Sequence, residues 1–126
     1  MSKNETWMTR HYWETVGGLL IEEYVVVKSS SSQGVRRLDG LIILGEPKDI
    51  IYAKQYDITG KDVICIQTKN SRLGMSVMGQ AYFSRELLKL HYPRSIRTVI
   101  LVPKSDDVLI KICEESEIEV EIIGKQ

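Results

Sequence analysis

Polar residues at the ends of two apolar segments are the best candidates for chemistry in this chain of 126 residues. Asp39 lies near the start of the apolar segment 38–44, and Gln67 and Lys69 end the apolar segment that begins at Val63. Carboxylate and amide oxygens are ligands that a hard cation such as Mg²⁺ prefers. A lysine beside such a cation can orient an attacking water and offset charge that builds on a phosphate. The pattern therefore predicts phosphodiester chemistry.

The period of a β-strand brings these side chains to one face. Successive side chains of a strand point to opposite faces, so Gln67 and Lys69 emerge together from a strand over 62–68. Asp39 similarly shares a face with Leu41 and Ile43, and it converges with Gln67 if the two strands are neighbours. Two simpler interpretations stay open. Asp39-Gly40 is a typical hairpin-turn dipeptide, and Gln67 and Lys69 suit a polar strand end that leads into a loop.

The surrounding elements alternate between helix and strand, which predicts one α/β domain over residues 1–126. Helices are expected over 8–23 and 74–91, the second ending before Pro93, and a short third helix after Asp106. Strands are expected over 24–28, 38–44, 50–53, 62–68, 97–102 and 118–122, with a flexible serine loop over 29–34. This order predicts a mixed β-sheet flanked by helices.

Arg37-Leu38-Asp39-Gly40 and Ile66-Gln67-Thr68-Lys69 resemble the two motifs of the PD-(D/E)xK nuclease superfamily, which has the restriction-endonuclease-like fold. The chain looks closest to the branch of Holliday-junction resolvases and modified-DNA restriction enzymes, where Gln-x-Lys is an accepted second motif. The resemblance covers most of the chain and implies an α-β-β-β-α-β core followed by a C-terminal helix and strand. It implies Asp39 and Gln67 as metal ligands, joined by the Thr68 carbonyl, Lys69 as the catalytic lysine, and Mg²⁺ or Mn²⁺ as the cofactor.

The same resemblance implies further site residues. Many members carry a glutamate on the first helix, and Glu14 is the best match, with Glu22 and Glu23 as rivals; a solvated helix glutamate is the alternative. Gln80 resembles a glutamine found near DNA in some branches, and capping at the edge of the core is as good an interpretation. The chain departs from the family at Leu38, where the motif has proline, and at Gln67, which leaves Asp39 as the one assured anionic ligand.

Charge is unevenly placed along a chain whose net charge is zero. Residues 67–97 hold six bases and one acid, and residues 105–126 hold seven acids and two bases. Zero net charge argues against a monomer that binds nucleic acid through overall charge, whereas the basic segment favours one face toward phosphates. Solvated helix charges are the alternative. Contacts to DNA are expected from Arg36, Arg37, Arg72, Gln80 and Arg85.

Other residue types exclude several classes of function. His11 and His91 have no partners at zinc-ligand spacing, and the two cysteines are too few for a disulfide framework. We therefore expect a cytoplasmic protein, with no segment long enough to cross a bilayer. The sequence predicts a metal-dependent DNA endonuclease that acts as a homodimer. The alternatives are a catalytically inactive nuclease-fold module that binds nucleic acid or a protein partner, and a plain α/β domain in which Asp39 makes a turn.

Overall fold

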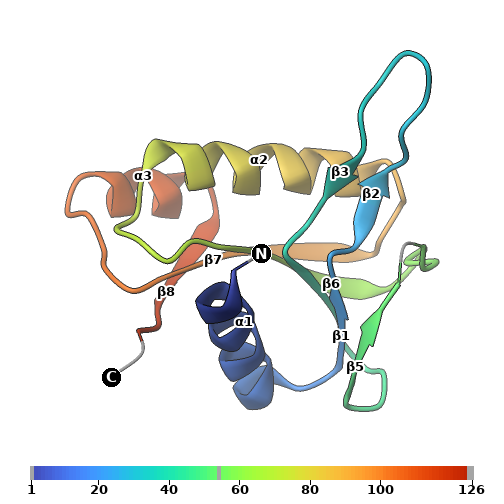
Figure 1. Cartoon of the computed structure of the whole chain (residues 1–126), viewed down its shortest axis with the longest axis horizontal. Coiled ribbons are helices and arrows are strands. Elements are labelled where there is room, and N and C mark those ends of the chain that lie inside the picture. The colour runs from blue at the N-terminus through green and yellow to red at the C-terminus, as the bar shows by residue number, and fades with distance from the viewer. Residues whose placement is uncertain (1, 54, 125–126) are drawn as a thin grey trace.

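A mixed β-sheet with helices on both faces organises the computed structural model, which describes residues 2–53 and 55–124 (Figure 1). Within these residues the helices are α1 (Lys3–Val16), α2 (Met75–Lys89) and α3 (Leu109–Glu115). The strands of the main sheet are β1 (Leu19–Glu22), β4 (Gly40–Ile43), β5 (Asp49–Tyr52), β6 (Asp62–Thr68), β7 (Ser95–Val102) and β8 (Ile118–Ile122). A separate two-stranded ribbon pairs β2 (Val25–Val27) with β3 (Arg36–Arg37).

The longest internal strands lie at the centre of the sheet, whose order is β5-β1-β4-β6-β7-β8. β4 runs antiparallel to both β1 and β6, whereas β7 runs parallel to β6 and β8. Figure 1 shows α2 and α3 on one face of the sheet and α1 on the other. Val63 to Ile66 are therefore buried on both faces, which explains why this segment is continuously apolar instead of alternating.

Two separate apolar layers follow from the two faces of β6. Ile64 and Ile66 pack in one cluster with Met8 and Tyr12 of α1. Val63 and Cys65 belong to a second cluster, which includes Leu41 of β4 and Leu88 of α2. None of the helices in the described part of the chain is long and apolar enough to cross a membrane.

The prediction of one helix over 8–23 is wrong at both ends. α1 begins at Lys3, after a capping box in which the Ser2 hydroxyl accepts from the Glu5 N–H and the Glu5 carboxylate accepts from the Ser2 N–H. It ends before Gly17 and Gly18, whose φ values of 83° and 79° turn the chain. A Cβ at Gly18 would lie 2.6 Å from the Ile43 carbonyl oxygen, so this close approach requires glycine. Residues 19–22 are strand β1, buried along its whole length.

Except for β3, which none of the predicted strands includes, the remaining elements agree with the sequence in type and nearly in extent. Strand β6 has the predicted bounds, α2 lies within 74–91, and β7 begins two residues earlier than expected. β2, β4 and β5 lie inside or beside the segments expected to be strands, and β8 spans 118–122. Asp106 precedes α3 and accepts from the N–H groups of Val108 and Leu109, as expected of a capping residue.

Candidate functional site

The pairing of β4 with β6 brings Asp39 beside Gln67. The register matches Leu41 with Cys65 and Gly40 with Ile66, so the next step outward sets Asp39 across from Gln67. Both side chains line a pocket of about 430 Å³ between the sheet, β3 and α2. We call it the Asp39 pocket. The hairpin-turn interpretation of Asp39-Gly40 is wrong, because Gly40 is the first residue of β4 and packs on the α1 side of the sheet.

Asp39 is a partly buried carboxylate at the end of its strand. Its Oδ2 atom accepts from the Thr68 N–H at 2.8 Å, which ties the two strand ends together. Burial raises the pKa of Asp39 to about 6; the Thr68 N–H opposes this shift, and the charges of Glu23 and Glu5 add to it. A cation bound at this carboxylate would relieve the cost of its ionisation.

Gln67 is fixed from the opposite side. Its side chain is buried, and its Nε2 atom donates to Ser84 Oγ of α2 at 3.0 Å. Lys69 is the first residue after β6, with an exposed side chain, and its backbone N–H donates to the Leu101 carbonyl at 3.0 Å. Gln67 is thus held in place by α2, whereas Lys69 is exposed, acts electrostatically on Glu5, and is not among the residues that line the Asp39 pocket.

Three of the predicted DNA-contact residues line the same pocket as Asp39, namely Arg36, Arg37 and Gln80. The other two are engaged elsewhere. Arg72 donates to the Ser105 carbonyl at 2.7 Å, and Arg85 donates to the Ser116 carbonyl at 2.8 Å. These two arginines tie the surroundings of α2 to the C-terminal part of the chain, and the structure does not bring them to the Asp39 pocket.

The structure does not bring Glu14 to Asp39. The Glu14 carboxylate is exposed on α1 and forms an ion pair with Lys48 at 3.0 Å. Its rival Glu22 forms an ion pair with Arg10 at 2.8 Å, whereas the charge of the other rival, Glu23, acts on Asp39. Glu23 also has a left-handed backbone with φ of 54°, which is uncommon outside glycine, and its N–H donates to the Asp39 carbonyl at 3.3 Å.

Glu5 is the acid of α1 that lies next to the site, and sequence reasoning missed it. Its Oε2 atom accepts from the Asn70 N–H at 3.0 Å, one residue beyond Lys69. Burial alone would raise the pKa of Glu5. The N–H groups of Ser2 and Asn70 and the charge of Lys69 outweigh that effect, so the pKa of Glu5 is lower than normal. The sequence signal was the capping box Ser2-x-x-Glu5, which marks a helix that starts before residue 8.

The oxygen donors near Asp39 fit a hard cation in kind. A carboxylate, an amide and a backbone carbonyl are ligands for Mg²⁺ or Mn²⁺, with waters completing the coordination. Across residues 2–53 and 55–124, no group of three or more His, Cys, Asp or Glu side chains is arranged to hold a metal ion. A cation here would therefore depend on Asp39 as its main charged ligand.

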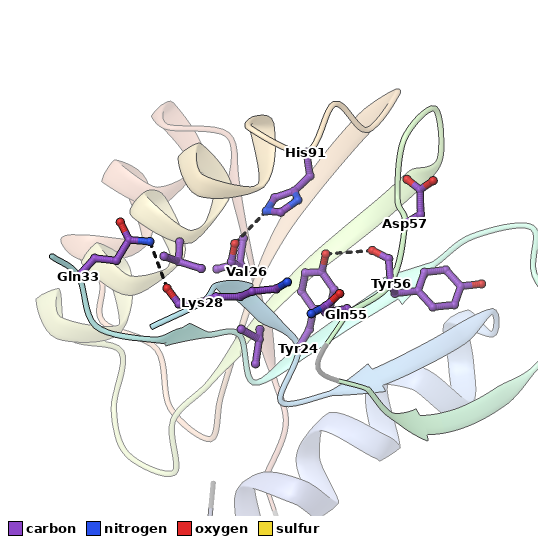
Figure 2. A pocket seen from close by; sticks show the side chains of 10 residues that line it. Tyr24, Val26, Lys28, Gln33, Gln55, Tyr56, Asp57 and His91 are labelled. Atoms are coloured by element: carbon purple, nitrogen blue, oxygen red, sulfur yellow. Dashed lines mark hydrogen bonds between the residues drawn. The ribbon is translucent and has the colours of Figure 1, made fainter. Parts of the chain in front are cut away.

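A larger pocket of about 680 Å³ lies beside β2 (Figure 2), and hydrogen bonds among the residues that line it hold the β2–β3 ribbon in place. The Tyr24 hydroxyl donates to the Tyr56 carbonyl at 3.2 Å, and the His91 ring is bonded to the Val26 carbonyl at 2.8 Å. Both bonds are drawn as dashed lines in Figure 2. These bonds join β2 to the segment around Tyr56 and to the chain after α2. The pocket contains none of the predicted site residues, and its walls position the ribbon that carries Arg36 and Arg37.

Comparison of the chain with models of protein families, with curated proteins and with solved structures found no match in any of the three. What the chain does is therefore inferred from its own residues.

Proposed function

We propose that this protein is a metal-dependent DNA endonuclease in which Asp39 and Gln67 bind the cation and Lys69 is the catalytic lysine. The observation that carries the proposal is the meeting of Asp39 and Gln67 in one pocket whose walls include Arg36 and Arg37. When bound, Mg²⁺ or Mn²⁺ would polarise the phosphate and lower the pKa of a coordinated water. The arginines bind phosphates by charge and hydrogen bonds, and Lys69 offsets negative charge at the phosphate under attack.

The strand directions support a restriction-endonuclease-like fold. β1, β4 and β6 are successive antiparallel neighbours, β7 is parallel to β6, and α1 and α2 cover opposite faces. With β2, β3 and β5 set aside, the element order is compatible with the α-β-β-β-α-β core that the motif resemblance implies, followed by α3 and β8. β5 and the β2–β3 ribbon are additions to that core.

Within this proposal Glu5 takes the place expected for Glu14. Its carboxylate holds the Asn70 N–H, so it positions the chain just after Lys69. Glu14 lies nine residues beyond Glu5, which is about 13 Å along a helix and puts Glu14 outside the site. We further propose that the enzyme is cytoplasmic and acts as a homodimer, so that two sites address two strands.

A catalytically inactive module that binds nucleic acid or a protein partner is the second candidate. The specific observation in its favour is Gln67, a neutral side chain whose amide is already bonded to Ser84. With one assured anionic ligand in the Asp39 pocket, metal affinity is expected to be weaker than in a site with two carboxylates.

Cleavage assays test the two candidates. Purified protein should cut plasmid or branched DNA in Mg²⁺ or Mn²⁺, and Asp39→Ala and Lys69→Ala should each abolish cutting. Glu14→Ala is the matched control and should keep full activity, whereas Glu5→Gln should reduce it. Gln67→Glu should bind Mg²⁺ more tightly by calorimetry. Wild-type protein that binds DNA but cuts none of these substrates would identify the inactive module. Loss of both properties contradicts the nuclease and a module that binds nucleic acid, and it leaves a protein-binding module or a plain α/β domain.

A further inference from the structure

An aromatic ring stands exposed in the wall of the Asp39 pocket. Phe83 of α2 lines the pocket beside Gln80 and Leu87, yet its side chain is 65% exposed. A phosphate alone would not use this ring, because a phosphate is bound by charge and by hydrogen-bond donors. The flat apolar surface suits the face of a nucleobase, which stacks on aromatic side chains.

We propose that the Asp39 pocket receives one unpaired nucleotide of a DNA strand, with its base stacked on Phe83. This inference rests on the proposed function, since it places the strand at the same Asp39 and Gln67. Beyond the proposed function, it specifies the class of substrate as single-stranded or locally unpaired DNA. It also identifies Phe83 as the residue that selects this substrate.

In this proposal, one wall of the pocket contacts the phosphate of the nucleotide and the opposite wall contacts its base. Arg36 and Arg37 line the pocket from β3, and guanidinium groups are typical ligands of phosphate. Phe83 and Gln80 approach from α2, where the ring stacks on the base and the amide can bond to its polar edge. Asp39 and Gln67 lie on the sheet between these two sides.

The size of the pocket favours one nucleotide over a double helix. About 430 Å³ is near the lower end of the volumes of small-molecule sites. A base within a duplex is paired and stacked on both faces, so Phe83 could reach one only after extrusion, which costs a few kcal/mol. An unpaired base does not carry that cost.

Phe83 contacts the ring of its neighbour on α2. Its ring packs edge-on against Tyr82, with 5.2 Å between the ring centroids. The Arg85 guanidinium lies 5.2 Å from the centroid of the Tyr82 ring and is anchored by the Ser116 carbonyl. Arg85 thus packs on Tyr82, the ring neighbour of Phe83, from outside the Asp39 pocket.

Binding measurements in EDTA test this inference without cleavage. Fluorescence anisotropy with a labelled single-stranded oligonucleotide and with the matching duplex should show tighter binding of the single strand. Phe83→Ala should weaken single-strand binding about tenfold, since stacking on one aromatic ring is worth roughly that factor per base. Phe83→Tyr should restore it, and duplex binding should hardly change. A 2-aminopurine base in the strand should be quenched by wild-type protein and not by Phe83→Ala.

Tyr52→Ala is the matched control, because Tyr52 has the same exposed fraction of 65% and lies on β5, away from the pocket.

Equal binding of duplex and single strand, or no effect of Phe83→Ala, overturns the inference. Sedimentation in which Phe83→Ala dissociates a dimer while single-strand binding is unchanged also overturns it, since the ring then serves a second copy. Cleavage of duplex DNA that Phe83→Ala does not change would support the nuclease function and reject the unpaired nucleotide as its substrate. Phe83-dependent binding with no cleavage in Mg²⁺ or Mn²⁺ would reject the nuclease alone.

Discussion

At the scale of single residues, Asp39 dominates the electrostatics of the pocket. Its carboxylate is partly buried, accepts one N–H from Thr68, and feels the negative charges of Glu23 and Glu5. An ionised group in such a place destabilises the fold unless a cation accompanies it. The same cost would favour a bound cation at this carboxylate, so we expect stability and binding to be coupled at this one side chain.

Asp39→Asn should therefore stabilise the protein at neutral pH while it removes metal-dependent activity. The pKa of Asp39 is raised from 3.8 to about 6 in the folded state, so folded protein keeps a proton that unfolded protein loses as pH rises between these values. Stability thus falls with rising pH across this window and stays lower above it. The asparagine variant lacks this loss, and its Oδ1 atom can still accept from Thr68. Urea denaturation should show a gain of about 2 kcal/mol for the variant at pH 7.5 and little at pH 4.

Asp57→Asn is the control for that measurement. Asp57 is exposed, and the Thr59 N–H lowers its pKa, so its stabilising effect is lost as pH falls. Asp57→Asn should therefore be less stable than wild type at pH 7.5, and this difference should shrink as pH falls. A pH-independent difference between Asp39→Asn and wild type would contradict the coupling proposed for Asp39.

Gln67 offers a second prediction at the residue scale. Its amide and the Ser84 hydroxyl are both buried and bonded to each other. Ser84→Ala leaves the amide donor without this partner, which should cost about 1 to 2 kcal/mol in thermal or urea unfolding. Metal affinity should also fall, because nothing then orients Gln67. Ser76→Ala, on the exposed first turn of the same helix, is the control and should change neither property.

Which site residues the sequence could reveal depends on how regular the contacts are that position them. Asp39 and Gln67 follow from strand alternation and the pairing of adjacent strands, both of which are regular. Arg72 and Arg85 could not be placed, because the carbonyl groups that bind them lie 31 residues or more further along the chain. Glu5 was missed for a local reason, since the apolar spacing that marks a helix starts after its first turn.

At the scale of elements, the packing of α1 on the sheet depends on a glycine. A Cβ at Gly40 of β4 would lie 3.1 Å from Thr9 Cγ2 of α1 and 3.2 Å from Leu20 Cδ1 of β1. The helix and the two strands therefore approach one another more closely than a side chain at this position permits. This contact lies next to the bond between the hydroxyls of Thr9 and Thr68, so it also sets the distance of α1 from the end of β6.

Gly40→Ala should destabilise the protein by about 1 to 3 kcal/mol, because the added methyl group overpacks this contact. Gly79→Ala is the matched control within a helix. A Cβ there meets nothing within 4 Å, and replacing a helical glycine by alanine should stabilise by about 0.5 to 1 kcal/mol. Urea unfolding of both variants measures the two effects. Equal stability of the two variants would show that α1 can move away from β4 without cost.

The elements differ in how far the sequence determined them. β6 was predicted with its full extent because a buried central strand is a continuous apolar run with β-branched residues. β1 was merged with α1 because Leu19 and Leu20 continue the helical spacing of Tyr12 and Val16. Only the backbone of Gly17 and Gly18, with its two positive φ values, separates the two elements.

At the scale of the whole molecule, the basic segment does not form one cationic face. Arg94 is bonded to Asp62, Arg97 to Glu119, and Lys89 to Glu86. These pairs neutralise much of the charge that residues 67–97 carry in the sequence. Arg36 and Arg37 are exposed on the ribbon and line the Asp39 pocket, and the Arg36 guanidinium also donates to the Val35 carbonyl at 3.1 Å. We therefore expect these two residues to be the cations best placed to meet a DNA strand.

The salt dependence of DNA binding should therefore depend on the ribbon and not on the basic segment. Each phosphate contact on a single strand contributes about −0.7 to the slope of log affinity against log salt concentration. The double variant Arg36→Ala with Arg37→Ala should make this slope shallower by about 1.4 in anisotropy titrations between 50 and 200 mM salt. Arg94→Ala should leave the slope unchanged, because its guanidinium is bonded to Asp62. If Arg94→Ala made the slope shallower by more than the ribbon variant does, the DNA would lie on the Arg94 side of α2. That result would contradict binding of DNA at the Asp39 pocket.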